Sequence, residues 1–187
     1  MTLSLAIPRL ETSRLILRGP EPEDFEPLCR FLLDQERSAG FGTEKDRPKA
    51  WRWFAMSIGH WALHGYGYFT MEWKETGAPC GMTGIWNPEG WPEPELGWLV
   101  YAGFEGRSIA FEGATCAREW AYADLGFDTL TSNILPNNTR SVALAQRLGA
   151  IFERSYDNVE MGEDHLYRGV AGCPAPGRGR DHRHQMG

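Results

Sequence analysis

The sequence predicts a single α/β domain at residues 1–170, built as a mixed β-sheet with helices on its faces. Its 187 residues suit one well-packed domain and are short for two. Strand candidates come first along the chain and are followed by alternating strands and helices. The longest apolar runs are only a few residues, far below the roughly 20 needed to cross a bilayer. We therefore expect no membrane association.

Short apolar or alternating runs predict the strands. They span 15–17, 66–73, 80–86, 95–101, 129–135, 151–156 and 165–170. The turn at 74–77 ends on Gly77, whose backbone freedom suits a hairpin between the second and third strands.

Apolar residues at helical spacing predict four helices. They cover the stretch from Pro22 to Leu33, then 45–64, 108–124 and 138–148. Pro27 is expected to confine the first helix to the residues after it. The second should bury one face formed by Trp51, Phe54, Ile58, Trp61 and Ala62. The third is the clearest, because Ile109, Gly113, Cys116, Ala117, Trp120 and Ala121 form one face and Gly126 suits its end.

Composition narrows the function classes. The net charge of −6 argues against nonspecific nucleic-acid binding and favours a cationic partner. The four cysteines form no C-x-x-C pair, and His60 and His64 have no evident third ligand, so we expect no metal. No secretion signal is evident, which favours a cytoplasmic location. Residues 171–187 are rich in Gly, Pro, Arg and His and predict a flexible C-terminal tail.

The segment 95–110 carries the clearest chemical signal, because a strand and a glycine-containing turn lead into a long helix. The first turn of a helix exposes free N–H groups and a partial positive charge, which together can bind a pyrophosphate. This logic alone is weak, since many helices follow such turns.

Four pieces of sequence stand out in order along the chain: Leu-Glu-Thr-Ser-Arg-Leu-Ile-Leu-Arg at 10–18, Glu-Leu-Gly-Trp-Leu at 95–99, Gly-Arg-Ser-Ile-Ala-Phe-Glu at 106–112, and Asn-Thr-Arg-Ser-Val-Ala-Leu-Ala-Gln-Arg-Leu-Gly at 138–149. Together they resemble the GNAT superfamily of N-acetyltransferases, in particular its branch that acetylates the N-termini of ribosomal proteins. The resemblance implies a mostly antiparallel central sheet of six to seven strands with helices on both faces. It also implies acetyl-CoA as co-substrate and a primary amine, on a protein N-terminus or a small molecule, as acceptor.

The resemblance also implies where acetyl-CoA binds. Its pantetheine arm and acetyl carbonyl would lie along Trp98, Leu99 and Val100, and its pyrophosphate at the loop and helix start. The residues expected around the pyrophosphate are Gly106, Arg107, Ser108, Ile109 and Ala110. The family loop reads Gln/Arg-x-x-Gly-x-Gly/Ala, whereas Glu105 and Ser108 occupy its first two defined positions here. Glu105 places a negative charge near the phosphates, and Ser108 adds a Cβ where the family has none.

The catalytic candidates follow from direct attack of an amine on a thioester, which needs a base and a proton donor for the thiolate. Glu95 is the candidate base, with Glu93 or a water chain as alternatives. Ser141 is the candidate donor, and it also belongs to the residues expected around the cofactor. Asn138 would bind the pantetheine amide, although Asn is also a common helix N-cap. The Tyr that many relatives carry four residues after this Ser is Ala145 here, which leaves Tyr156 or Tyr167 as possible substitutes.

Two further questions stay open at the level of sequence. Trp51, Trp53, Trp61, Trp86, Trp91 and Trp98 fall in segments expected around the acceptor, where they can form an aromatic wall or simply pack the core. The departures at Glu105, Ser108 and Ala145 also allow a catalytically degenerate protein that binds acyl-CoA or a protein partner. A homodimer is compatible with the family and is not established by the sequence.

Overall fold

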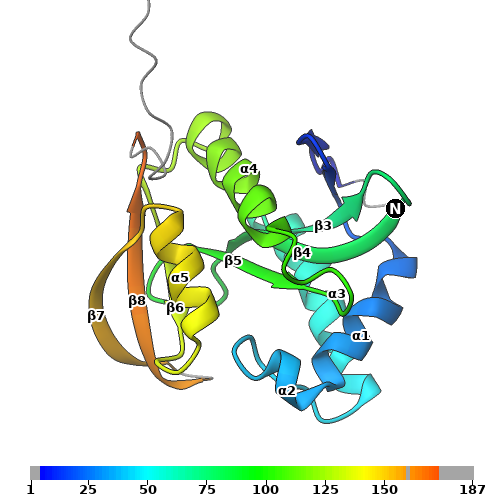
Figure 1. Cartoon of the computed structure of the whole chain (residues 1–187), viewed down its shortest axis with the longest axis horizontal. Helices are drawn as coiled ribbons and strands as arrows, with labels where there is room; N and C mark the ends of the chain where they lie inside the picture. Colours follow the sequence, from blue (N-terminus) through cyan, green and yellow to red (C-terminus); the bar gives the residue numbers. More distant parts are fainter. Residues whose placement is uncertain (1–4, 159–160, 173–187) are drawn as a thin grey trace, which may run out of the picture.

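The computed structural model describes residues 5–158 and 161–172, which form one eight-stranded sheet surrounded by helices (Figure 1). The strand order is β1-β2-β3-β4-β5-β6-β8-β7, and every neighbouring pair is antiparallel except β5 and β6. The predicted fold class is therefore confirmed, with a slightly higher strand count. Of the predicted tail, Ala171 and Gly172 form a turn, and 173–187 lie outside the described residues.

The elements follow the predicted ones to within a few residues, apart from the first strand and the short helix at 35–38, which were not predicted. The strands are β1 (Leu10–Glu11), β2 (Leu15–Arg18), β3 (Tyr68–Trp73), β4 (Ala78–Trp86), β5 (Glu95–Val100), β6 (Thr129–Ile134), β7 (Ile151–Asn158) and β8 (Gly162–Val170). The helices are η1 (Pro22–Asp24), α1 (Phe25–Leu33), α2 (Gln35–Ser38), α3 (Arg47–His64), α4 (Ile109–Asp124) and α5 (Thr139–Arg147). None of these helices is long and apolar enough to span a membrane.

Two expectations about the helices were wrong. Helix α1 begins at Phe25 and contains Pro27, which is tolerated because the first-turn N–H groups of a helix have no intrahelical acceptor. In α3, Trp51 and Ala62 are exposed, whereas Ala50, Ser57 and His60 join Phe54 and Trp61 as buried residues. The buried face of α3 is therefore less apolar than its sequence suggested.

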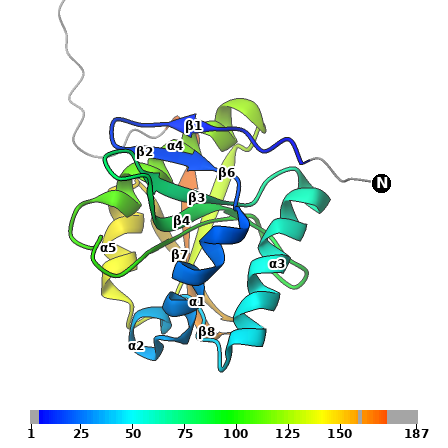
Figure 2. The same cartoon turned by 90° about the vertical axis from the view of Figure 1, so that its right-hand side faces the viewer.

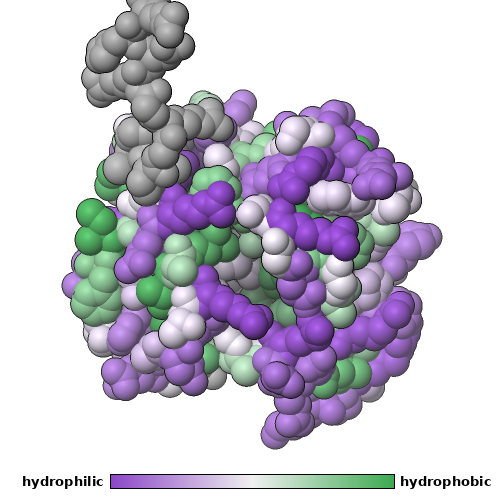
Figure 3. Space-filling view, in the orientation of Figure 1, coloured by the Kyte–Doolittle hydropathy of each residue, from purple (hydrophilic) through white to green (hydrophobic). Residues whose placement is uncertain are grey.

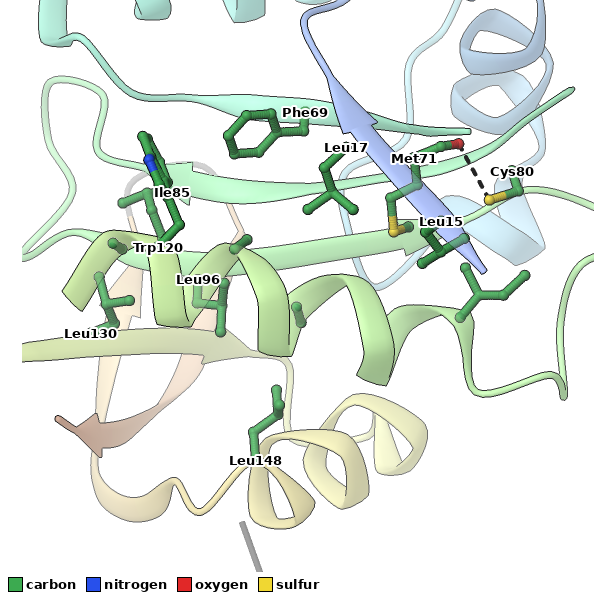
Figure 4. Close-up of a cluster of buried hydrophobic side chains, with 14 of the residues drawn as sticks. Leu15, Leu17, Phe69, Met71, Cys80, Ile85, Leu96, Trp120, Leu130 and Leu148 are labelled. Carbon is green, nitrogen blue, oxygen red and sulfur yellow. Dashed lines mark hydrogen bonds between the residues drawn. The ribbon is translucent and has the colours of Figure 1, made fainter. Parts of the chain in front are cut away.

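The sheet carries a hydrophobic cluster on each side. Helix α4 lies on one side, where Trp120 and neighbouring small residues pack against Leu15, Leu17, Phe69, Met71 and Ile85 (Figure 4). Helices α1 and α3 lie on the other side and pack on Tyr68, Met82, Trp86 and Leu99 (Figures 1 and 2). Because successive side chains of a strand point to opposite faces, Glu95, Gly97 and Leu99 of β5 all face the α1 and α3 side.

The cysteines take part in this packing. Cys29 and Cys80 are buried, Cys116 is partly buried, and all three are free thiols. The Cys80 thiol donates to the Met71 carbonyl, and burial raises its pKa to about 12 (Figure 4). Cys173 lies outside the described residues.

Candidate active site

Strands β5 and β6 pair at a single position and then separate. Glu95 pairs with Thr131 in parallel register, and the Ser132 hydroxyl donates to the Leu96 carbonyl at 2.8 Å. Beyond this point no ladder joins the two strands within the described part of the chain. The separation leaves one edge of β5 without a strand partner, next to the start of α5.

A cavity of about 280 Å³ opens where the strands separate. Its walls come from β5, from β6 and the turn after it, from the first turn of α5 and from the loop at 40–44 that follows α2. Asn158, Met161 and Asp164 close the side formed by β7 and β8. Figure 3 shows a hollow on this face of the molecule, paler and greener inside than its hydrophilic rim.

Glu95 lies at the point of separation and lines the cavity. Burial raises the pKa of its carboxyl group to about 7, and the nearby Asp164 carboxylate adds to the effect. The hydrogen bond that Asn133 donates to the carboxylate and the nearby Trp91 indole N–H act in the opposite direction. A carboxyl group with a pKa near neutrality changes protonation state readily at neutral pH, as a general base must.

Glu93, the alternative base, forms a bidentate ion pair with Arg168. Its two carboxylate oxygens accept from the two terminal nitrogens of Arg168, each at 2.7 Å. These bonds hold the pKa of Glu93 below its usual range, and Glu93 is not among the cavity residues. Of the two candidate bases, only Glu95 reaches the cavity.

Asn138 and Ser141 come together at the start of α5. The Asn138 carboxamide oxygen accepts from the Ser141 backbone N–H at 3.2 Å, so Asn138 caps the helix. Its amide nitrogen packs against Gly40, where a Cβ would come within 2.1 Å of it. The Trp98 indole N–H donates to the Ser141 hydroxyl oxygen at 3.3 Å, which leaves the hydroxyl proton free. Both residues line the cavity with Glu95 and Trp98.

The predicted pyrophosphate loop forms a turn directly before α4. Gly106 and Ser108 both adopt positive φ, at 74° and 58°, and Ser108 is the N-cap of the helix that begins at Ile109. A Ser in the left-handed region is strained, and its side chain makes no capping bond. The chain thus has the glycine-like backbone of the family loop without the glycine. Arg107 and Ala110 flank these residues, and the loop, like Leu99 and Val100, lies outside the cavity wall.

The negative charge of Glu105 is compensated within this region. Its carboxylate forms an ion pair with Arg37 of α2 and accepts from the Gly103 N–H at 2.8 Å. Arg37 also pairs with Asp34 at 3.2 Å. Arg37 therefore offsets the negative charge of Glu105, which replaces the Gln or Arg of the family loop.

Four of the six singled-out tryptophans line the cavity. Trp53, Trp86, Trp91 and Trp98 do so, together with Phe41 and Tyr68. Trp61 instead packs in the cluster beneath α4, and Trp51 is 50% exposed. Four of these tryptophans therefore form an aromatic wall of the cavity, one packs in the core, and one is exposed.

Sequence reasoning missed Tyr68, Asn133 and Asp164. Asn133 donates to the Glu95 carboxylate, and Asp164 is a buried carboxylate in the cavity wall. None of the three belongs to a sequence motif. The pairing of Gly84 with Gly97 across β4 and β5, which leaves room there for a large side chain, is visible only in the structure.

The residues considered in connection with the family's tyrosine proton donor do not line the cavity. Ala145 is fully buried and packs with Tyr167 and Ile134 in a small separate cluster. Neither Tyr167 nor Tyr156 is among the cavity residues. The space beside Ala145 is therefore filled by Tyr167 of β8. Tyr156 lies behind the cavity wall, where its hydroxyl accepts a hydrogen bond at 3.2 Å from Asn158, which lines the cavity.

His60 and His64 stack on each other, but both ring nitrogens of His60 are engaged. Its Nδ1 lies 2.8 Å from the Tyr66 carbonyl, and its Nε2 accepts from the Asn87 N–H at 3.0 Å. His60 therefore ties α3 to the ends of β3 and β4. Over the described residues, no group of three His, Cys, Asp or Glu side chains has metal-binding geometry.

The chain is similar to known acetyltransferases. A family model described as an acetyltransferase (GNAT) domain matches residues 14–151. The acetyltransferase from Agrobacterium tumefaciens is 36% identical with a TM-score of 0.81, over 90% of this chain and 97% of that one. These matches show that the chain belongs to the GNAT acetyltransferase family, and hence that it is an N-acetyltransferase.

Two more distant structures share the fold. The ribosomal-protein-S5-alanine acetyltransferase from Vibrio fischeri is 14% identical with a TM-score of 0.67, over 87% of this chain and 96% of that one. RimL, a ribosomal L7/L12 α-N-protein acetyltransferase solved in complex with coenzyme A, is 15% identical with a TM-score of 0.70, over 87% and 98%.

Proposed function

We propose that this acetyltransferase moves the acetyl group of acetyl-CoA directly to a primary amine in the cavity between β5 and β6. The observation that carries the proposal is Glu95, a cavity carboxyl group whose pKa is raised to about 7. Bound acetyl-CoA supplies the acetyl group as a thioester. The acceptor is a protein N-terminus or a small amine.

The cavity chemistry suits a cationic acceptor. Glu44, Glu95 and Asp164 contribute carboxylates, and no lysine or arginine is among the described residues that line the cavity. Aromatic rings supply the rest of the acceptor side, and their faces attract ammonium groups. An amine that enters as its ammonium form therefore gains from both features.

Each catalytic residue has one task. Glu95 takes a proton from the acceptor, directly or through a water, which frees the nitrogen lone pair for attack. Ser141 gives its proton to the departing sulfur. Because Trp98 donates to the Ser141 oxygen, that hydroxyl is oriented with its own proton available for donation.

The residues present fit acetyl-CoA. The unpaired edge of β5 can extend its backbone hydrogen bonds to the amides of a pantetheine arm. The first turn of α4 and the glycine-like backbone at Gly106 and Ser108 suit a pyrophosphate. Asn138 uses its side-chain oxygen to cap α5 and also lines the cavity, where it can contact the pantetheine arm. A cytoplasmic location and a homodimer stay predictions.

Calorimetric titration with acetyl-CoA, with desulfo-CoA and ATP as controls, tests the cofactor. Micromolar binding that requires the pantetheine arm is the expected result. Equal affinity for ATP would contradict the proposal. Stoichiometric acetyl-CoA binding without turnover on any amine would favour the catalytically degenerate alternative.

A further inference from the structure

The Tyr68 side chain crosses the sheet to reach the candidate active site. Tyr68 pairs with Gly84 of β4, and Gly84 pairs with Gly97 of β5. A Cβ placed on Gly97 would lie 1.9 Å from the Tyr68 hydroxyl oxygen. The hydroxyl therefore occupies the place that a side chain at position 97 would take, on the same face of β5 as Glu95.

The ring of Tyr68 is fixed, while its hydroxyl makes no protein hydrogen bond. Tyr68 is 2% exposed, and its ring packs against Phe41, Trp53 and Trp86 with centroids 5.9, 5.9 and 5.4 Å away. The Trp61 indole N–H holds the backbone through the Tyr68 carbonyl at 2.9 Å. Among the described residues, none donates to or accepts from the hydroxyl, although Tyr68 lines the cavity.

Because the Tyr68 hydroxyl has no protein partner and lies at the cavity, a ligand in the cavity that pairs with it gains a hydrogen bond. We propose that the Tyr68 hydroxyl donates a hydrogen bond to the carbonyl oxygen of the transferring acetyl group. This inference rests on the proposed function. It makes Tyr68 a catalytic residue for which the family motifs provide no position.

The proposed donor lies where negative charge develops. As the new N–C bond forms, the carbonyl electrons move onto oxygen, and they return as the C–S bond breaks. The ammonium first gives one proton to Glu95, the second nitrogen proton leaves to solvent, and the sulfur takes the Ser141 proton, which solvent replaces. Burial, reinforced by the Glu95 charge, raises the pKa of Tyr68 well above its usual value, so the phenol stays protonated as a donor.

The test compares Tyr68→Phe with Tyr101→Phe. The Tyr101 hydroxyl is buried and has no hydrogen-bond partner among the described residues. Tyr101 belongs to the same hydrophobic cluster as Tyr68 but does not line the cavity. Tyr68→Phe should lower kcat roughly 100-fold, the usual effect of losing one such donor, with KM for the amine and Kd for acetyl-CoA within about twofold. Tyr101→Phe should keep the wild-type kcat.

The infrared carbonyl stretch of bound acetyl-CoA provides a second readout that needs no turnover. The wild-type protein should lower the stretching frequency relative to free acetyl-CoA, and Tyr68→Phe should remove most of that shift. A Tyr68→Phe kcat within twofold of wild type, or a loss confined to the KM for the amine, would refute the role. If Glu95→Gln is impaired while Tyr68→Phe is not, the proposed function stands and this inference fails. If acetyl-CoA does not bind, both fail.

Discussion

Replacement of Glu95 by Gln should lower activity and raise stability at alkaline pH. The folded pKa of about 7 lies above the ordinary value of 4.5, so the folded protein binds this proton more tightly than the unfolded chain does. The Glu95 contribution to folding stability is therefore most favourable below about pH 4.5 and is lost as the pH rises through 7. Gln cannot ionise, so the variant avoids this loss.

The size of the effect follows from the pKa shift. About 2.5 pKa units correspond to about 3 kcal/mol, which we reduce to about 1–3 kcal/mol because water reaches part of the side chain. Urea unfolding at pH 5 and pH 8 measures it: the stability of Glu95→Gln relative to wild type should increase by this amount between the two pH values. The same variant should lose the rise in kcat/KM centred near pH 7.

Glu93→Gln is the matched control. Its carboxylate has a lowered pKa because Arg168 donates to it, so its contribution to stability is present above the unfolded pKa and is lost at acid pH. Glu93→Gln should therefore destabilise the protein at pH 8 and keep the wild-type pH–rate profile. An equal Glu95→Gln stability difference at both pH values, with an unchanged pH–rate profile, would refute the reasoning.

Three further substitutions test the cofactor loop and the acid. Ser108→Gly should relieve the left-handed strain and, after the entropy cost of glycine, raise stability by about 0.5–1 kcal/mol, whereas Ser108→Ala should not; urea midpoints decide. Glu105→Gln should free Arg37 and lower the calorimetric Kd for acetyl-CoA about two- to threefold at 0.15 M salt, and an unchanged Kd would place the pair outside phosphate range. Ser141→Ala should reduce kcat roughly 100-fold without changing acetyl-CoA affinity, and wild-type turnover would remove Ser141 from the site.

The sequence predicted a helix well where one face of the helix is apolar and buried and the opposite face is exposed. In α4, Ile109, Gly113, Ala117, Trp120 and Ala121 are buried as expected, because a helix on a sheet exposes its opposite face. The same reasoning misplaced the face of α3. There, His60 is buried because two backbone groups satisfy its ring nitrogens, and such partners have no local sequence signature.

The site was predictable only where a motif is local. Glu95, Trp98, Asn138 and Ser141 lie in two short motifs, and the structure brings all four to one cavity. Partners that are distant in sequence were not predictable: Arg37, for example, pairs with Glu105 across 68 residues. Tyr68 reaches the cavity through sheet register and two glycines, which only the paired strands reveal.

The most direct test is transfer itself. Wild-type protein and Glu95→Gln would be incubated with acetyl-CoA and a panel of cationic primary amines and N-terminal peptides, with free CoA and acetylated acceptor quantified by chromatography and mass spectrometry. The account predicts equal amounts of CoA and acetylated amine from the wild type, and much slower formation of both from Glu95→Gln. Acetyl transfer at the wild-type rate by Glu95→Gln, or acetyl-CoA binding without transfer to any amine, would contradict it.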